Sequence, residues 1–247
     1  MLDSFRADLH IHTCLSPCAS LDMTPKRIIE EAVNRGLNIV AITDHNAHEN
    51  IPPAVKLGEK QGVFVVPGME VTTSEEVHVL GLFPSIDSLK EFQEVVYNGL
   101  PEREGVVPDF EQVIVNENDE VEGFNRKNLI GATTLGIKSA VSMIRQLGGI
   151  AIASHIDREV FGIIAHIGFI PEDVLFDALE ISWSMPTDTA RESYKQYAGI
   201  PWVRASDAHH IQDIGRCYTE FIIKTPSFDE IKSALKSEGG RAIRGII

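Results

Sequence analysis

Short apolar runs alternate with longer amphipathic segments along most of this chain. The runs are rich in valine and isoleucine, as expected of strands that are buried on both faces of a sheet. They predict strands over 7–11, 38–43, 63–66, 77–83, 150–153, 178–181, 202–205 and 219–223, with Pro67-Gly68 ending the third. Apolar residues at helical spacing predict one helix from Pro25 up to Gly36, and others over 52–61, 138–147, 171–177, 188–198 and 227–238.

Strands that alternate with helices of this length indicate βαβ units and a parallel sheet. The 247 residues contain about seven strand–helix pairs, which fit a single closed or doubly wound α/β domain. The alternation is interrupted between 102 and 122, where eight acidic residues accompany one basic residue. We expect an acidic insertion or surface excursion around 100–128, with a hairpin formed by the strand 113–115 and the polar turn 116–120.

The charge balance narrows the choice of partners. Thirty-six Asp and Glu against 22 Lys and Arg give a formal net charge of −14. Such a surface repels phosphate backbones, so we expect no extended nucleic-acid duplex as a partner and favour a small phosphorylated substrate. Three cysteines, no apolar run long enough for a membrane span and no apolar leader predict a cytoplasmic protein without a membrane partner.

Side chains that can bind metal ions stand at the ends of nearly all predicted strands. Because the carboxyl ends of parallel strands meet at one rim of an α/β barrel, these side chains are expected to converge. His10 and His12 are two residues apart on one strand, so both imidazoles point to the same face. Imidazole and carboxylate together suit Zn²⁺, Mn²⁺ or Fe²⁺, and the ligands are too many for one ion. The residues at the strand ends are His10, His12, Asp44, His45, Glu70, His78, His155, Asp207 and His209.

These residues lie in motifs that resemble those of the PHP (polymerase and histidinol phosphatase) superfamily. The likeness runs from residue 8 to about 216 and keeps the family's order of motifs. It implies a distorted TIM-like (β/α)7 barrel that forms one domain over 1–247, with two to three divalent metal ions (Zn, Mn or Fe) in its mouth. The motifs are Asp8-Leu-His-Ile-His-Thr, Ile42-Thr-Asp-His45, Pro67-Gly-Met-Glu70, the single residues His78 and His155, and Ser206-Asp-Ala-His209.

The resemblance also implies how the ligands divide among the ions. Glu70 is expected to bridge two of them, and the third ion takes one ligand from the loop that follows the first strand. The implied sets are His10, His12, Glu70 and Asp207 for the first ion, Glu70, His78 and His155 for the second, and His45, His209 and the loop residue for the third.

The loop residue is where this sequence departs from its relatives. They carry His or Asp six or seven residues beyond the second histidine of the first motif, where this chain has Cys18 and Ala19. A thiolate binds Zn²⁺ or Fe²⁺ well and Mg²⁺ poorly. Either Cys18 completes the third site, or that site is weak and Cys18 fills space under the loop.

Four further residues near the motifs have two possible roles each. Asp44 either touches a metal ion or orients His45, and Glu180 either supports a ligand or is an ordinary polar residue of the barrel interior. Arg158 and Arg216 are the cations nearest to the motifs in sequence, and a guanidinium suits phosphate. Each arginine either anchors the substrate or forms a salt bridge at the rim.

The expected function is that of a metal-dependent phosphoric ester hydrolase. We expect a phosphatase that hydrolyses a small phosphate monoester or a nucleotide phosphate through a metal-activated hydroxide. Asp207, His209 and Glu70 are the expected catalytic residues, and His209 or a metal-bound water assists the leaving group. The alternatives are a nuclease acting on oligonucleotide ends and a noncatalytic, metal-stabilised module that docks a partner. The nearly complete ligand set favours an enzyme over such a module.

Overall fold

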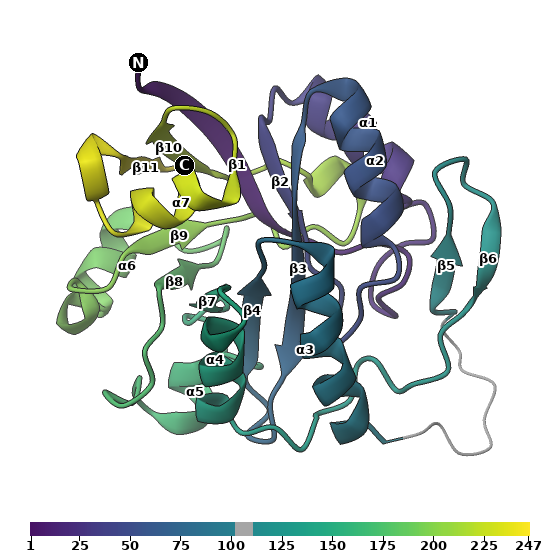
Figure 1. The fold of residues 1–247 in the computed structure, drawn as a ribbon. Helices are drawn as coiled ribbons and strands as arrows, with labels where there is room; N and C mark the ends of the chain where they lie inside the picture. The colour runs from purple at the N-terminus through teal and green to yellow at the C-terminus, as the bar shows by residue number, and fades with distance from the viewer. Residues whose placement is uncertain (102–110) are drawn as a thin grey trace.

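The computed structural model describes residues 1–101 and 111–247 (Figure 1). A nine-stranded sheet forms its centre, with the strands in the order β11-β10-β1-β2-β3-β4-β7-β8-β9. These strands are β1 (Asp3–Ile11), β2 (Ile39–Ile42), β3 (Phe64–Thr72), β4 (His78–Leu82), β7 (Ile150–Ala153), β8 (Ala178–Ile181), β9 (Trp202–Arg204), β10 (Thr219–Ile223) and β11 (Ala242–Ile246).

Seven of these strands curl into a nearly closed barrel, which confirms the predicted distorted TIM-like fold. The segment after β9 returns to the end of β1, where the His12 backbone N–H donates to the Ala208 carbonyl at 3.1 Å. The Thr219 hydroxyl on β10 bonds the backbone of Arg204 on β9. The barrel therefore runs from β1 through β2, β3, β4, β7, β8 and β9 back to β1.

The prediction of an all-parallel sheet is wrong for β4. This strand pairs antiparallel with both β3 and β7, because only five residues connect it to β3. A parallel crossover needs a dozen residues or more, so the short link forces a hairpin. Antiparallel β10 and β11 extend the sheet beyond β1, and β11 was not predicted from the sequence.

The expected end of the third strand at Pro67-Gly68 is also wrong, because both residues lie inside β3. Pro67 pairs with Ile42 of β2, and its carbonyl accepts a hydrogen bond from the Phe83 backbone at 2.8 Å. A Cβ atom on Gly68 would lie 2.8 Å from Thr43 Cγ2 and 2.9 Å from Leu82 Cδ2. The glycine is therefore needed for close packing within the strand, and it does not mark a turn.

Helices cover the outside of the barrel, and most of the predicted ones are present. Thr24 caps the first by accepting from the Arg27 backbone N–H. The predicted helix over 171–177 is wrong. The Asp177 backbone N–H donates to the Ala151 carbonyl, and the Asp177 carboxylate accepts from the Ala151 N–H, so the chain before β8 is held against β7. The prediction also omitted α3. The helices are α1 (Pro25–Asn34), α2 (Ile51–Gln61), α3 (Ile86–Gly99), α4 (Ile137–Gln146), α5 (Ile163–Ile167), α6 (Thr187–Ser193) and α7 (Phe228–Leu235).

The apolar core has two layers that follow the alternation of side chains along the strands. One layer packs between the strands and helices α1 to α4, with Val40 and Val65 among its strand residues. The other layer consists of side chains on the opposite faces of the strands and lines the barrel interior. It includes Val66 on β3, Ala178 on β8 and Val203 on β9. Polar residues continue these interior faces toward the mouth, as Glu180 does beyond Ala178.

The predicted hairpin is confirmed, and its two strands form a small separate sheet beside the barrel (Figure 1). The strands are β5 (Val113–Val115) and β6 (Val121–Phe124). The Cys14 carbonyl accepts from the Val113 backbone N–H at 3.1 Å, so the hairpin attaches to the loop after β1. Part of the predicted acidic excursion, 102–110, lies outside the described residues, and the domain assignment over 1–247 stays a prediction. Among the described helices, none has the length and apolar character needed to cross a bilayer.

Candidate metal centre

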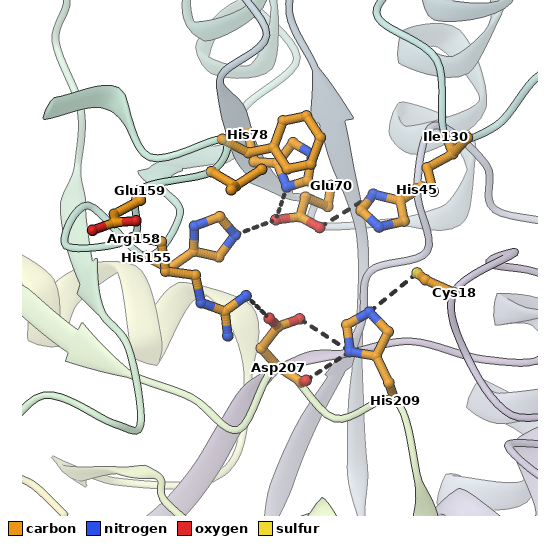
Figure 2. A pocket seen from close by; sticks show the side chains of 12 residues that line it. Cys18, His45, Glu70, His78, Ile130, His155, Arg158, Glu159, Asp207 and His209 are labelled. Carbon is orange, nitrogen blue, oxygen red and sulfur yellow. Dashed lines mark hydrogen bonds and ion pairs between the residues drawn. The ribbon is translucent and has the colours of Figure 1, made fainter. Parts of the chain in front are cut away.

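The predicted metal ligands converge at one rim of the barrel (Figure 2). Most follow the carboxyl end of a strand, as His155 does after β7 and Asp207 after β9. His78 differs, because it is the first residue of β4. Since β4 runs antiparallel to its neighbours, its amino end lies at the rim where the other strands end. The expectation that these ligands stand at the carboxyl ends of parallel strands is therefore wrong for His78, although the residue reaches the same cluster.

Four buried side chains point their ligand atoms at one spot. The Nε2 atoms of His10 and His12 are 3.1 Å apart, and each lies 3.4 Å from Glu70 Oε2. Asp207 Oδ1 lies 3.3 Å from His10 Nε2 and 3.2 Å from His12 Nε2. Two imidazoles and two carboxylates at this spacing form a donor set that suits a divalent metal ion. They are the four residues that the resemblance implied for the first ion.

Glu70 also faces histidines on its other side. Its Oε1 atom lies 3.0 Å from His78 Nδ1 and 3.2 Å from His155 Nε2, and its Oε2 atom lies 3.2 Å from His45 Nδ1. Several of these atoms are buried and make no hydrogen bond, which costs about 1–3 kcal/mol for each polar group. Bound metal ions would satisfy those that face the cluster, which excludes His155 Nδ1 because the Nε2 atom of that ring faces Glu70. The unpartnered atoms in the cluster are His45 Nδ1, Glu70 Oε1, His78 Nδ1, His155 Nδ1 and Asp207 Oδ1.

The structure also brings Cys18 to the cluster. Its Sγ atom lies 3.1 Å from His209 Nε2, and Figure 2 shows the thiol pointing into the cavity from the loop after β1. Ligand atoms of Cys18, His209, His45 and His12 all lie within 4.8 Å of one another. The sulfur therefore lies within reach of the residues implied for the third ion, and its role as a ligand stays a prediction.

Two carboxylates hold the histidines of β1 in place. Glu180 Oε2 lies 3.0 Å from His10 Nδ1, on the side of the ring opposite the cluster. Asp44 accepts the Ser16 hydroxyl at 2.6 Å, and Ser16 Oγ lies 3.0 Å from His12 Nδ1. Asp44 is therefore linked through Ser16 to the His12 ring and to the backbone N–H of His45, which donates to Ser16 Oγ at 3.1 Å. Such partners fix the tautomer and direction of a ligating ring.

The two candidate arginines differ in position. Arg158 lines the cavity, and its Nη1 atom lies 2.5 Å from Asp207 Oδ2. Arg216 is not among the residues lining the cavity. Its guanidinium donates to the Ser206 carbonyl at 3.0 and 2.6 Å and stacks on the Trp183 ring. Arg158 is thus the cation available to an anionic substrate at the cluster.

The neighbouring charges set the protonation of the histidines. Burial lowers the pKa of His12, but hydrogen bonds and charges of Asp207 and Glu70 outweigh burial and raise it to about 9. For His209, burial and then the charge of His12 lower the pKa to about 4. Burial also lowers the pKa of His45 well below its usual range. His45 and His209 are therefore neutral at pH 7 and present lone pairs, as metal ligands must.

Four residues that the sequence reasoning missed also line the cavity, which measures about 470 Å³. These are Ile130, Glu159, Val160 and Phe161. The Phe161 ring lies parallel to His78 at 4.2 Å between centroids, and its backbone has a φ of 61°. His155 and Asp207 also have positive φ, and strain of this kind gathers at functional sites. No periodicity marks such loop residues in the sequence, although Phe161 follows His155 by only six positions.

Comparison with known proteins agrees with this geometry. Residues 8–172 match the PHP domain family, a range that holds most of β1, the strands β2 to β7 and all of the candidate ligands except Asp207 and His209. The chain belongs to the PHP family. Residues 189–238 match a second family described as PHP-associated.

Two relatives of this PHP chain are hydrolases of phosphate esters. It is 36% identical over 80 residues to phosphoribosyl 1,2-cyclic phosphate 1,2-diphosphodiesterase of Eggerthella lenta. The aligned stretch covers 30% of this chain and 29% of that protein. It is 34% identical over 80 residues to the 5'-3' exoribonuclease Rnm of Escherichia coli, covering 30% and 26%. The predicted enzyme class agrees with both.

A similar solved structure is the lesion-specific endonuclease Q of Pyrococcus furiosus. It superposes with a TM-score of 0.78 at 26% identity, over 99% of this chain and 58% of the endonuclease. A complex of endonuclease Q with a 27-mer duplex carrying an abasic lesion at the active site superposes with a TM-score of 0.74, at 25% identity. The chain spans less than two thirds of the length of each of these relatives.

The duplex complex overturns one expectation from the sequence. A net charge of −14 was taken to exclude an extended duplex and to favour a small substrate, and that prediction is wrong. Net charge averages over the whole chain, whereas a duplex meets only the field near the site. Five of the 36 acidic residues are buried in or beside the cluster, where metal ions would compensate them: Asp8, Asp44, Glu70, Glu180 and Asp207.

Proposed function

We propose that this chain is a metal-dependent nuclease that hydrolyses phosphodiester bonds in nucleic acid. The observation that carries the proposal is the buried set of convergent ligands beneath an open cavity that Arg158 lines. The similarity to endonuclease Q over nearly the whole chain supports a nucleic-acid substrate over a small phosphate monoester. The exoribonuclease and the cyclic phosphodiesterase among its relatives support phosphodiester chemistry.

We assign two to three divalent ions to the cluster, in the three sets that the resemblance implied, with Cys18 as the loop ligand. Ions of this kind activate a water molecule and neutralise the oxygens of a phosphoryl group. Glu70 presents one oxygen to His10 and His12 and the other to His78 and His155, so it is placed to bridge two ions. The donor set of imidazole, carboxylate and thiolate favours Zn²⁺ or Fe²⁺ over Mg²⁺.

The remaining side chains position the substrate and the ligands. Arg158 pairs with Asp207 and borders the cavity, so its free guanidinium nitrogens can bind a nonbridging phosphate oxygen. His209 has a pKa of about 4, so its ring is neutral at pH 7 and keeps one proton, on the Nδ1 atom that donates to the Asp207 carbonyl. We therefore assign Nε2 to metal binding instead of to protonation of the leaving group. Glu180 and Ser16 keep His10 and His12 in the orientation that the cluster needs.

A hydrolysis assay tests this function. Chain purified without chelator is loaded with Mn²⁺, Zn²⁺ or Fe²⁺ and given labelled single strands, intact duplexes, duplexes with one abasic site, and p-nitrophenyl phosphate. We expect cleavage of at least one nucleic-acid substrate, and Asp207→Asn is expected to lower turnover by orders of magnitude because one metal ligand loses its charge.

The matched control is His210→Asn, since His210 is exposed beside His209 and is not among the residues lining the cavity. It should keep wild-type turnover. Cleavage of p-nitrophenyl phosphate without cleavage of any nucleic acid would favour the phosphatase, and no hydrolysis with all metals bound would favour a noncatalytic module.

A further inference from the structure

Trp183 is a large aromatic residue for which the metal cluster provides no role. It lies on the loop directly after β8, at the rim where the ligands gather. The residue is 46% exposed, which is high for a tryptophan. Among the described residues its indole makes one specific contact, with the Arg216 guanidinium carbon 4.0 Å from the ring centroid. One part of the ring is thus supported by a cation while the rest is open to solvent.

The support beneath the ring is anchored to the site. Arg216 donates through Nε and Nη2 to the carbonyl of Ser206, the residue before Asp207. Its Nη1 atom lies 3.4 Å from Asp213 Oδ1, so the guanidinium is held on several sides. A guanidinium with this many partners is not free to bind phosphate, but it forms a rigid, flat backing for the indole.

The loop that carries Trp183 is anchored to the site as well. The Ser182 backbone N–H donates to Asp157 Oδ1 at 2.7 Å, and the Ser182 hydroxyl bonds the same carboxylate. Asp157 lies between His155 and Arg158 in the chain. The indole is therefore tied through Ser182 to the loop after β7 and through Arg216 to the loop after β9.

We propose that Trp183, backed by Arg216, is a stacking platform for one base of the nucleic-acid strand bound at the cluster. The proposal rests on the nuclease function proposed above. Every base presents an aromatic face, so stacking on an exposed indole tolerates any sequence. Stacking also does not require a positive surface, so it adds to whatever affinity the phosphate contacts supply.

An exposed tryptophan also suits a protein interface, but one ring offers far less than the roughly 1,000 Å² that a specific interface buries. Its anchoring to both loops of the site favours a substrate. Contact between copies of the chain is kept as an outcome of the test.

The chain has two tryptophans, so Trp202→Phe leaves Trp183 as the only indole fluorophore. This metal-loaded variant is titrated with a 12-nucleotide thymidine strand that has phosphorothioate linkages to slow cleavage, and with an abasic strand of the same length and linkages. We expect the thymidine strand to quench the fluorescence and the abasic strand to leave it unchanged. Unchanged fluorescence with both strands would overturn the platform.

Affinity measurements complete the test. Trp183→Ala should weaken binding of the thymidine strand by roughly 5- to 150-fold, and Trp183→Phe should restore most of it. Leu175→Ala is the control, since Leu175 is 63% exposed but lies before β8, at the opposite end of that strand. Trp183→Ala with wild-type affinity overturns the proposal, and an altered oligomeric state at unchanged affinity would assign the residue to contact between copies. If the wild type cleaves no nucleic acid, the nuclease function fails by a separate measurement.

Discussion

Replacement of Cys18 by serine tests whether the thiol completes the third metal site. Three ligands are available at the third site. His12 is not one of them, because its Nε2 atom faces the ligands of the first ion and its Nδ1 atom lies against Ser16 Oγ. Cys18, His45 and His209 remain, which is the usual number of protein ligands in a zinc site with an open position. Without the sulfur, two histidines are left, too few for a tight site. We therefore expect Cys18→Ser to bind one ion fewer per chain than the wild type.

The same substitution should change the number of protons that metal binding releases. His45 and His209 are neutral at pH 7, because their pKa values are lowered in the cluster, so they release nothing. The Cys18 thiol keeps its proton in the metal-free protein, because desolvation of the sulfur and the charge of Glu70 raise its pKa. Metal coordination deprotonates a thiol. Binding of the third ion should therefore release one proton from Cys18, and none in the serine variant.

Two measurements check these numbers. Elemental analysis gives the ions per chain, and titration calorimetry in two buffers of different ionisation enthalpy gives the protons released. The control is Cys14→Ser, since Cys14 is buried against Val113 and Asn50, away from the cluster. Equal ion and proton counts for Cys18→Ser and wild type would refute the ligand assignment, as would a loss seen only with Cys14→Ser.

Three further predictions concern the support of the site and the barrel. Glu180→Gln removes the charge facing His10 Nδ1 and should weaken metal binding about 10- to 100-fold in competition with a chelator, with unchanged affinity arguing against an orienting role. Arg158→Ala removes the cation beside the cavity and should lower kcat/KM for an oligonucleotide by about tenfold or more, whereas equal kinetics would place Arg158 in a rim salt bridge. Gly68→Ala places a methyl group against Thr43 and Leu82 and should cost about 1–3 kcal/mol of unfolding free energy, so an unchanged melting temperature would contradict the packing argument.

The sequence by itself determined the class of fold and most of the side chains that gather at the rim. Strands repeat their apolar residues every 2 positions and helices every 3.6 positions. Both repeats involve residues close in sequence, so the alternation of strands and helices can be predicted from the sequence. Strand ends meet at a barrel rim whatever the loops do, which is why His10, His155 and Asp207 are found together. The position of Cys18 near His209 was implied by the family resemblance, which places a ligand six or seven residues after His12.

Tertiary structure decided the features that depend on how loops meet. The direction of β4, which places His78 at the rim, comes from pairing with β3 and β7. The role of Asp44 through Ser16 and the stack of Arg216 on Trp183 join segments that are not adjacent in sequence. The prediction from net charge that no duplex binds was wrong, because the charges that act on a duplex are those near the site. Which charges lie there is decided when the barrel closes. Local sequence patterns encode local geometry, whereas contacts between loops exist only once the barrel closes.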